Sequence, residues 1–197
     1  MKSIVLGAAA LASLLATTAN AQTAAPANVG PAIPGVCVFF NQQVLAQSTA
    51  GQAVQARMQQ LATEVDGELQ PYATTLQTEA QALQAGASTI PAADLQSRRA
   101  ALQQRAQEAQ QLEQTRTAEL RYTLGAQREL ISQALEPLLV TIYQERGCGI
   151  MLDRESVFMM NPAMDVTPLA IERLNAALPT LSFNRMAVPV QAPAAAQ

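Results

Sequence analysis

The sequence predicts an α+β protein in which a long helical arm projects from a small β-sheet body. Two Gln/Ala-rich segments, residues 42–85 and 95–146, carry apolar side chains at steps of three and four residues, which is the spacing of a coiled-coil seam. Helix breakers within residues 86–94 separate these segments, and this favours an antiparallel helical hairpin. A short β-type segment flanks each outer end of the hairpin, at residues 36–40 and 148–152.

The first 21 residues have the three parts of a secretory signal peptide. Lys2 supplies the charge, an apolar stretch follows it, and Ala19 and Ala21 form a small-x-small cleavage site. We expect cleavage after Ala21 and export to the periplasm; an uncleaved membrane anchor is the alternative. The apolar stretch is shorter than the ~20 residues that span a bilayer, so no stable membrane insertion is expected. Residues 22–35 are rich in Pro and Gly and predict a flexible linker.

The body is assigned to residues 36–41 and 147–180, and the arm to residues 42–146. The segment before the arm, VCVFF, is apolar throughout, as expected for a short strand that is buried on both faces. Asn41 follows it and offers a side-chain acceptor for the N-cap of the first helix. Pro71 lies inside that helix, where we expect a bend and not a stop because the apolar stripe keeps its phase beyond it.

The seam of the return helix changes in character along its length. Small Ala side chains lie toward the tip of the hairpin, and large Leu and Ile side chains lie toward the body. Buried apolar surface contributes about 25 cal/mol per Å², so Ala contacts stabilise far less than Leu or Ile contacts. The packing energy is therefore expected to rise toward the body, and the distal part of the arm to be the less rigid part.

Beyond the arm, the sequence predicts two more strands and one helix. Residues 150–152 and 156–160 are β-rich and are separated by a polar turn, so they are expected to join the first strand in a three-stranded sheet. Thr167 and Pro168 open a last helix, which is expected to end before Pro179. Residues 181–197 are expected to form a loose tail.

The composition argues against nucleic-acid binding. The chain has 12 basic and 15 acidic residues, and removal of Lys2 with the signal peptide leaves 11 against 15, a net charge of −4. Neutralising phosphates requires a basic face, which this balance does not supply.

The same composition argues against catalysis. The chain has no histidine, which removes the usual general base and the commonest metal ligand. No phosphate-binding loop, nucleophile elbow or paired-carboxylate motif is present. We expect no enzyme activity, no catalytic residues, no metal and no cofactor. The acidic residues of the arm are interpreted as solvated helix faces.

The two cysteines are the most informative side chains. Cys37 and Cys148 lie in predicted strands at the two roots of the hairpin, where the arm brings those strands side by side. In an oxidising compartment this arrangement favours a structural disulfide. In the chain-entropy model such a bridge stabilises the fold by roughly 4 to 5 kcal/mol before any strain is subtracted. Two buried free thiols are the alternative, because unpaired cysteines are commonly buried.

A family resemblance rests on two stretches. The first is FFNQQVLAQSTAG, from Phe39 to Gly51, and the second and more specific one runs from Gly149 to Arg154 and continues with VFMMNPAMD, Thr167 and Asn175. With these residues in this order, residues 35–178 resemble the Skp/OmpH family of periplasmic chaperones. This resemblance implies a homotrimer whose strands form a joined β-body and whose arms surround a cavity. It also implies binding of unfolded outer-membrane proteins without ATP.

The residues themselves support part of this picture. A thin hairpin and a small sheet cannot bury all of their apolar surface alone, so oligomerisation is expected. Client contacts are expected to be many and weak, and no client-binding residues can be named from the sequence. The chain is acidic whereas members of the family are often basic, so capture of acidic clients by charge is not expected. The alternative function is a structural coiled-coil scaffold of the cell envelope.

Overall fold

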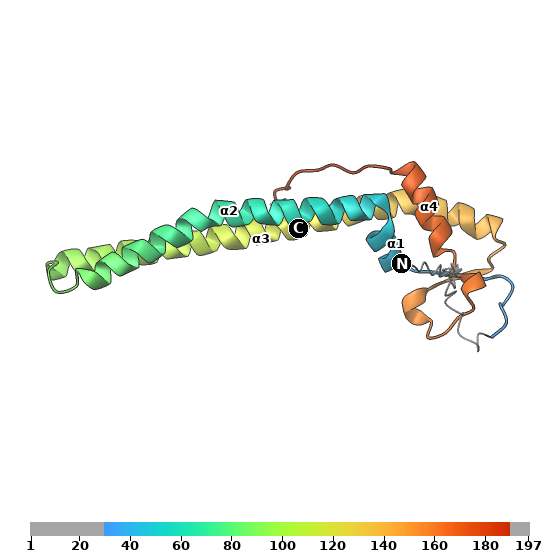
Figure 1. The fold of residues 1–197 in the computed structure, drawn as a ribbon, viewed down its shortest axis with the longest axis horizontal. Coiled ribbons are helices and arrows are strands. Elements are labelled where there is room, and N and C mark those ends of the chain that lie inside the picture. Colours follow the sequence, from blue (N-terminus) through green and yellow to red (C-terminus); the bar gives the residue numbers. More distant parts are fainter. Residues whose placement is uncertain (1–29, 190–197) are drawn as a thin grey trace, which may run out of the picture.

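The computed structural model describes residues 30–189. The predicted signal peptide, most of the predicted linker and the end of the predicted tail lie outside these residues. The described part is mostly helical and consists of a long arm and a small body (Figure 1). The arm comprises α2 (Thr49–Ala85), α3 (Ala92–Glu145) and the turn between them. The body comprises β1 (Val36–Phe39), α1 (Asn41–Gln47), β2 (Ile150–Asp153) and α4 (Thr167–Ala177).

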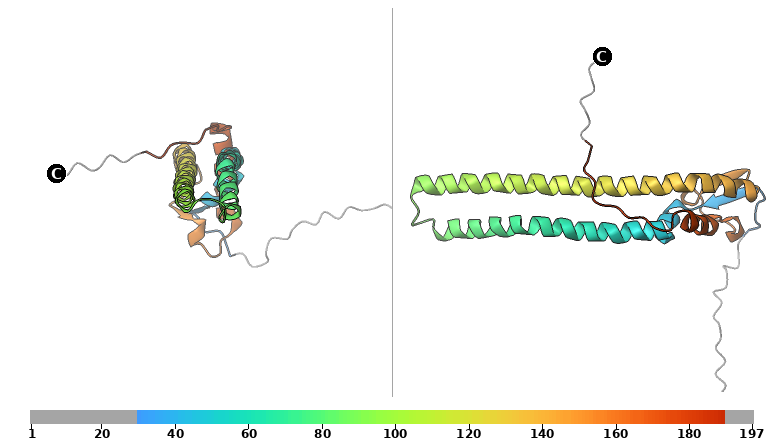
Figure 2. Two further views of the ribbon diagram at one scale, coloured as in Figure 1. Left: turned by 90° about the vertical axis from the view of Figure 1, so that its left-hand side faces the viewer. Right: turned by 90° about the horizontal axis from the view of Figure 1, so that it is seen from above.

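The two long helices lie side by side and are joined at the tip of the arm, as the end-on and top views show (Figure 2). The predicted breakers form this connection: α2 ends at Ala85, and Gly86 caps it through a hydrogen bond from its backbone N–H to the carbonyl of Ala82. Pro91 is extended and precedes the first helical residue of α3. The return helix therefore begins at Ala92, three residues before Leu95, where its apolar pattern begins. As predicted, α2 continues through Pro71 without a stop.

The first predicted helix is in fact two helices. Ser48 is extended and separates α1 from α2, and its hydroxyl accepts a hydrogen bond from the backbone N–H of Gly51 at 3.1 Å. A Cβ at Gly51 would lie 2.0 Å from the carbonyl oxygen of Leu45, so only glycine permits this close approach of the two helices. The apolar pattern predicted one continuous helix and was wrong, because the pattern of α1 runs into that of α2; the family resemblance over Phe39–Gly51 instead implied a short helix followed by a small-residue turn.

The prediction that Asn41 caps the first helix was also wrong. Asn41 is already the first residue of α1, Phe40 holds the N-cap position, and no side chain caps the helix there. The backbone N–H of Phe40 instead donates to the hydroxyl oxygen of Thr167 at 2.9 Å. The start of α1 is thus fastened to the start of α4, which lies 127 residues away in sequence.

The sheet has two strands within the described residues, and they are parallel. Val36 pairs with Ile150 and Phe39 pairs with Asp153 at the two ends of the register. Parallel neighbours need a crossover connection, and here the whole arm, with α1, forms it. On its other side β1 makes a single bridge, between Val38 and Asp165.

The third predicted strand, residues 156–160, does not form. The polar turn predicted before it does form, as a 3-10 turn at Arg154–Ser156, in which the carboxylate of Asp153 accepts a hydrogen bond from the backbone N–H of Glu155 at 2.8 Å. Phe158 and Met159 then lie 93% and 77% exposed. Their high β-propensity led to the wrong prediction. Such residues favour a strand when they can pack on a half-buried, pleated surface, and the described part of the chain offers this segment no such surface.

The core lies where the body meets the base of the arm. It is formed by apolar side chains from β1, α1, α4 and both arm helices, among them Phe39, Val44, Ala50, Val54, Ile131, Leu135, Ile142, Val166, Ala170 and Leu174. The last helix forms as predicted and ends before Pro179, and Leu174 on its inner face is fully buried. This core fixes the direction in which the arm leaves the body.

Candidate functional site: the arm, its root and its C-terminal strap

Burial divides the arm into two parts. The buried residues of α2 beyond its first turn are Val54, Leu61 and Val65, and those of α3 are Thr123, Gln127, Ile131, Leu135 and Ile142. We call the part that contains them the base, and residues 66–122 the distal arm. No residue of the distal arm is buried. This agrees with the predicted fall in packing toward the tip, and it leaves the distal seam open to solvent.

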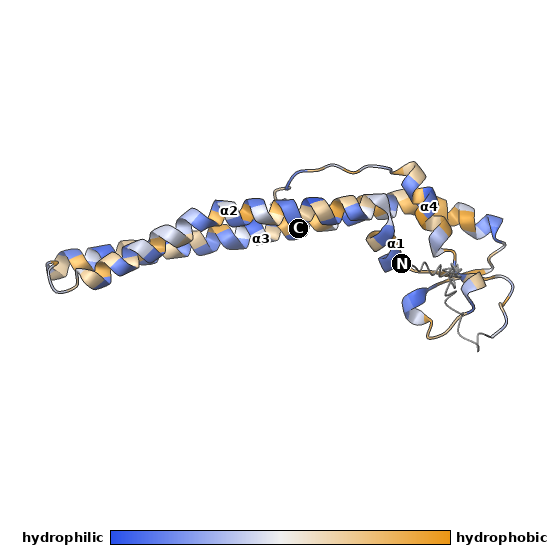
Figure 3. Ribbon diagram, viewed as in Figure 1, coloured by the Kyte–Doolittle hydropathy of each residue, from blue (hydrophilic) through white to orange (hydrophobic). Residues whose placement is uncertain are grey.

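The distal seam is a shallow, mixed surface. A hollow of about 580 Å³ is lined from both helices by Leu69, Tyr72, Leu76, Ala106, Ala109 and Glu113, among others. Tyr72 is 48% exposed there. Polar and apolar residues are interspersed along the whole arm (Figure 3). Such a surface offers many small apolar contacts with polar edges and no deep pocket of the kind that encloses a small ligand.

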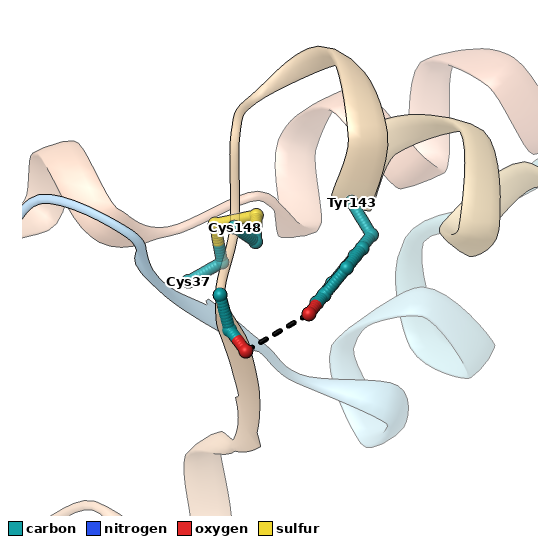
Figure 4. Close-up of a disulfide and its surroundings, with 4 residues drawn as sticks. Cys37, Tyr143 and Cys148 are labelled. Carbon is teal, nitrogen blue, oxygen red and sulfur yellow. Dashed lines mark hydrogen bonds between the residues drawn. A yellow bond between two sulfur atoms is a disulfide. The ribbon is translucent and has the colours of Figure 1, made fainter.

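The root of the arm carries a disulfide. Cys37 in β1 is bonded to Cys148, which lies between α3 and β2, and their Cα atoms are 5.7 Å apart (Figure 4). Both residues are 6% exposed. The Tyr143 hydroxyl donates a hydrogen bond to the carbonyl of Gly149 at 2.9 Å, so the last turn of α3 also holds the start of β2 (Figure 4). The two predicted partners are therefore brought together where α3 passes into β2.

The chain after α4 is not loose where the structure describes it. Residues 179–189, which we call the strap, leave α4 and run back over the base of the arm (Figures 1 and 2). From Leu181 to Met186 the side chains alternate between half-buried and exposed, as in an extended segment, and Leu181 and Phe183 pack against the core. The predicted loose tail is thus wrong for this stretch, because both arm helices bind it.

Two main-chain contacts hold the strap to the arm. The Nε of Arg57 on α2 donates to the carbonyl of Phe183 at 3.1 Å. The backbone N–H of Met186 donates to the hydroxyl oxygen of Thr123 on α3 at 2.8 Å. Thr123 is fully buried, and its hydroxyl donates in turn to the carbonyl of Glu119 at 2.7 Å. The strap thus contacts both helices through groups that every extended polypeptide possesses.

A four-residue ion-pair network lies at the end of the strap. Arg185 contacts Glu68 on α2 at 2.8 Å and Glu119 on α3 at 3.1 Å. Arg116 contacts the same two carboxylates at 2.7 and 3.0 Å. Hydrogen bonding from Arg185 is the largest cause that holds the pKa of Glu68 below its ordinary value; burial opposes it, and hydrogen bonding from Arg116 adds to the lowering. The network joins the two helices at the boundary between base and distal arm.

The matching family model covers residues 35–174 and is described as outer membrane protein (OmpH-like). The chain belongs to the OmpH-like family. A solved relative gives the fold: the crystal structure of an OmpH-like protein from Caulobacter crescentus CB15, assigned as an outer membrane chaperone, is 35% identical to this chain with a TM-score of 0.75. The match covers 84% of this chain and 98% of that one. Among curated proteins, none matches the sequence.

The resemblance stated from the sequence is confirmed, and the structure gives its residues physical roles. The hydroxyl oxygen of Thr167 accepts from Phe40, as described above, and the side-chain oxygen of Asn175 accepts from the backbone N–H of Thr49 at 2.8 Å. Asp165 accepts from the N–H of Thr167 at 2.8 Å. These residues dock α4 against the starts of α1 and α2, and so orient the arm on the body.

Other residues of the site were missed from the sequence. Nothing in the sequence indicated the contacts of Arg57, Thr123 and Arg185. Arg57 and Thr123 contact strap residues that lie 126 and 63 residues away in sequence. Arg185 contacts one carboxylate on each arm helix. The alternation of Leu181 and Phe183 with polar neighbours was the one local sign of an extended segment. The family match ends at residue 174, so the strap lies outside the region that the OmpH-like model covers.

No group of three acidic or cysteine side chains converges into a metal-holding arrangement within residues 30–189. Among the helices of that same stretch, none has the length and apolarity needed to cross a membrane.

Proposed function

We propose that the protein is an ATP-independent periplasmic holdase, which binds unfolded outer-membrane proteins and keeps them from aggregating before assembly. The observation that carries this proposal is the combination of OmpH-like membership with an arm whose distal seam has no buried residue. A long, shallow surface of small apolar and polar contacts suits unfolded chains of many sequences, which present no fixed shape to a pocket.

We also propose that the working unit is a homotrimer. Within residues 30–189 no strand pairs with the outer edge of β2, and exposed strand edges are usually covered by a partner. Phe158 and Met159, which follow β2, are highly exposed in the single chain. A joined body made of several copies would cover both features and would place the arms around a common space.

The periplasmic location belongs to the same proposal. The signal-peptide pattern in residues 1–21 and the family both support export. An oxidising periplasm would also form and maintain the bond between Cys37 and Cys148. Cell fractionation, with mass determination of the mature N-terminus, tests the location and the cleavage after Ala21.

The function is tested with the chain that lacks residues 1–21 and with a urea-unfolded outer-membrane β-barrel protein diluted into buffer without nucleotide. We expect the scattering of the aggregating barrel protein to fall as the holdase approaches one trimer per client. An excess of trimer that leaves the aggregation unchanged contradicts the proposal. Capture of one folded envelope protein at fixed stoichiometry, without binding of unfolded chains, would indicate the scaffold function instead.

The distal seam is tested by the double substitution Tyr72→Ser and Leu76→Ser, two residues that line hollows between the helices. We expect weaker protection of the unfolded client at equal concentration, because these substitutions remove apolar contacts. The matched control is Gln77→Ser together with Thr78→Ser, which changes exposed polar neighbours on the same turns. Equal protection of the client by both variants would show that unfolded clients do not bind at the distal seam.

A further inference from the structure

The strap occupies a surface that recognises extended polypeptide. Two of its contacts are to the main chain, from Arg57 to the carbonyl of Phe183 and from the N–H of Met186 to Thr123. Every residue of any protein except proline carries these two groups, so the contacts do not depend on sequence. They lie three residues apart along the strap and come from different helices. The surface between α2 and α3 at the base therefore fits a strand-like segment laid across it.

The side-chain contacts add a simple pattern. Leu181 and Phe183 face the arm and are half-buried, whereas Ser182 and Asn184, which follow them, are exposed. Arg185 completes the alternation and contacts the carboxylates of Glu68 and Glu119. The surface thus accepts alternate apolar residues followed by a cation. Alternation of apolar and polar residues is also the pattern of the strands of outer-membrane β-barrels.

The strap is held in a way that permits release. None of the residues from Leu181 to Pro189 is fully buried. The guanidinium nitrogen Nη1 of Arg185 is buried and has no hydrogen-bond partner among residues 30–189, which weakens the hold of this site on its own occupant. The strap also lies beyond residues 35–174, the region that the family model covers.

We propose that the strap is an intramolecular occupant of a client site, and that an extended, alternating segment of an unfolded outer-membrane protein displaces it. This inference rests on the proposed function and names one site where it acts. Attachment through α4 keeps the strap at a high effective concentration, so the site is closed in the absence of client. A client that already contacts the distal arms competes with the strap for the site, because its own segments are then also held nearby at a high effective concentration.

The first experiment uses no client. A fluorescent peptide of residues 179–197 is added to the full mature chain, and its anisotropy reports binding in trans. The wild-type chain should bind it weakly, because its own strap fills the site. The variant Arg185→Gln weakens the attached strap, so the peptide, which keeps the arginine, should bind roughly tenfold more tightly, as expected for loss of one charged hydrogen-bonding group.

The matched control is Ser182→Glu, which changes the net charge by the same amount at an exposed strap position. It should bind the peptide as weakly as the wild-type chain does. A peptide that carries the Arg185→Gln change itself should bind poorly to every chain. Equal, weak binding of the unmodified peptide to Arg185→Gln and to wild type would overturn the inference, because the strap would then be a fixed part of the fold.

The second experiment adds an unfolded β-barrel protein to the complex of the peptide with the Arg185→Gln chain. Release of the peptide supports a shared site. Client binding without release overturns the inference and leaves the proposed holdase function standing. Binding of the peptide without any binding of client would contradict the proposed holdase function but not the displaceable strap. Failure of one proposal can therefore be told apart from failure of the other.

Discussion

At the scale of single residues, Cys37 and Cys148 carry the largest expected contribution to stability. Their bond closes a loop of 111 residues, because it joins the two ends of the arm. A cross-link of this span lowers the conformational entropy of the unfolded chain far more than that of the folded chain, in which both sulfurs already lie in the core.

The substitution of both cysteines by Ser is therefore expected to lower the free energy of unfolding by about 2 to 5 kcal/mol. Urea unfolding of the wild-type and double-Ser chains measures it, and reduction of the wild-type chain should give a similar loss. Thiol alkylation with mass mapping of unreduced protein is the control for the bond itself. Full alkylation of both residues without reductant would contradict the bridge.

Glu68 makes the stability of the strap region depend on pH. Arg185 and Arg116 lower its pKa, so Glu68 binds its proton more weakly in the folded chain than in the unfolded chain. Its contribution is then fully present above the ordinary pKa of 4.5 and is lost as the pH falls through the lowered folded value. Glu119 contacts the same two arginines.

We expect the variant Glu68→Gln to melt at a lower temperature than wild type at pH 7, and the difference to shrink as the pH falls from about 4.5 toward 3. Thermal unfolding followed by circular dichroism at several pH values measures this. A difference that stays constant from pH 7 to pH 3 would show that the charge of Glu68 is not the cause.

At the scale of elements, the break between α1 and α2 depends on the lack of a side chain at Gly51. Gly67, on the exposed face of α2, provides a contrast because a Cβ there meets nothing within 4 Å. The same substitution is therefore expected to have opposite effects at the two positions.

Gly51→Ala should destabilise the fold by more than about 1 kcal/mol, because the new Cβ would overlap the backbone of α1. Gly67→Ala should stabilise it by about 0.5 to 1 kcal/mol, because Ala favours a helix interior. Urea unfolding of the two variants beside wild type measures both values. A stable Gly51→Ala chain would show that α1 can move away from α2 at little cost.

Apart from the break between α1 and α2 and the start of α1, the helices were predicted well because their signals are local. The seam, the breakers around Gly86 and the end of α4 before Pro179 depend on neighbours within a few turns. The strand after Asp153 was predicted wrongly for the complementary reason: residues 156–160 have the composition of a strand, but a strand also needs a partner. The parallel pairing of β1 with β2 was not predicted at all, since both directions fit the same residue pattern.

The candidate site was predicted only in part. The cysteine pair was found because its position at the two roots of the hairpin follows from the order of elements. The strap was not found, because its seat is formed by residues such as Arg57 and Thr123 that come together only when α2 and α3 are packed. No residue pattern within residues 181–197 predicts contacts with those partners.

At the scale of the whole molecule, the body has apolar surface that a single chain does not cover. Phe158 and Met159, which follow β2 in the chain, lie 93% and 77% exposed, and no strand within residues 30–189 pairs with the outer edge of β2. Exposed groups of this kind usually mark contact with another molecule. In the proposed trimer, the neighbouring copy is that molecule.

The double variant Phe158→Ser and Met159→Ser should therefore dissociate at protein concentrations where wild type remains trimeric, with little change in the helical content of each chain. Light scattering coupled to size exclusion, over a series of concentrations, measures the molar mass. Tyr72→Ser, a change at a partly exposed aromatic residue of the arm, is the control and should leave the mass unchanged. A variant that keeps the wild-type mass would place the contact between copies elsewhere on the body.

The parallel pairing of β1 with β2 also sets the order in which the molecule folds. Val36 meets Ile150, so the sheet cannot close until the intervening chain has brought its ends together. The hairpin helices form from contacts near in sequence, which are fast, whereas the strand pair has a large sequence separation and is slow. Each chain should thus form its arm early and its sheet late, and in the proposed trimer the copies can associate only after the chain has been synthesised as far as β2.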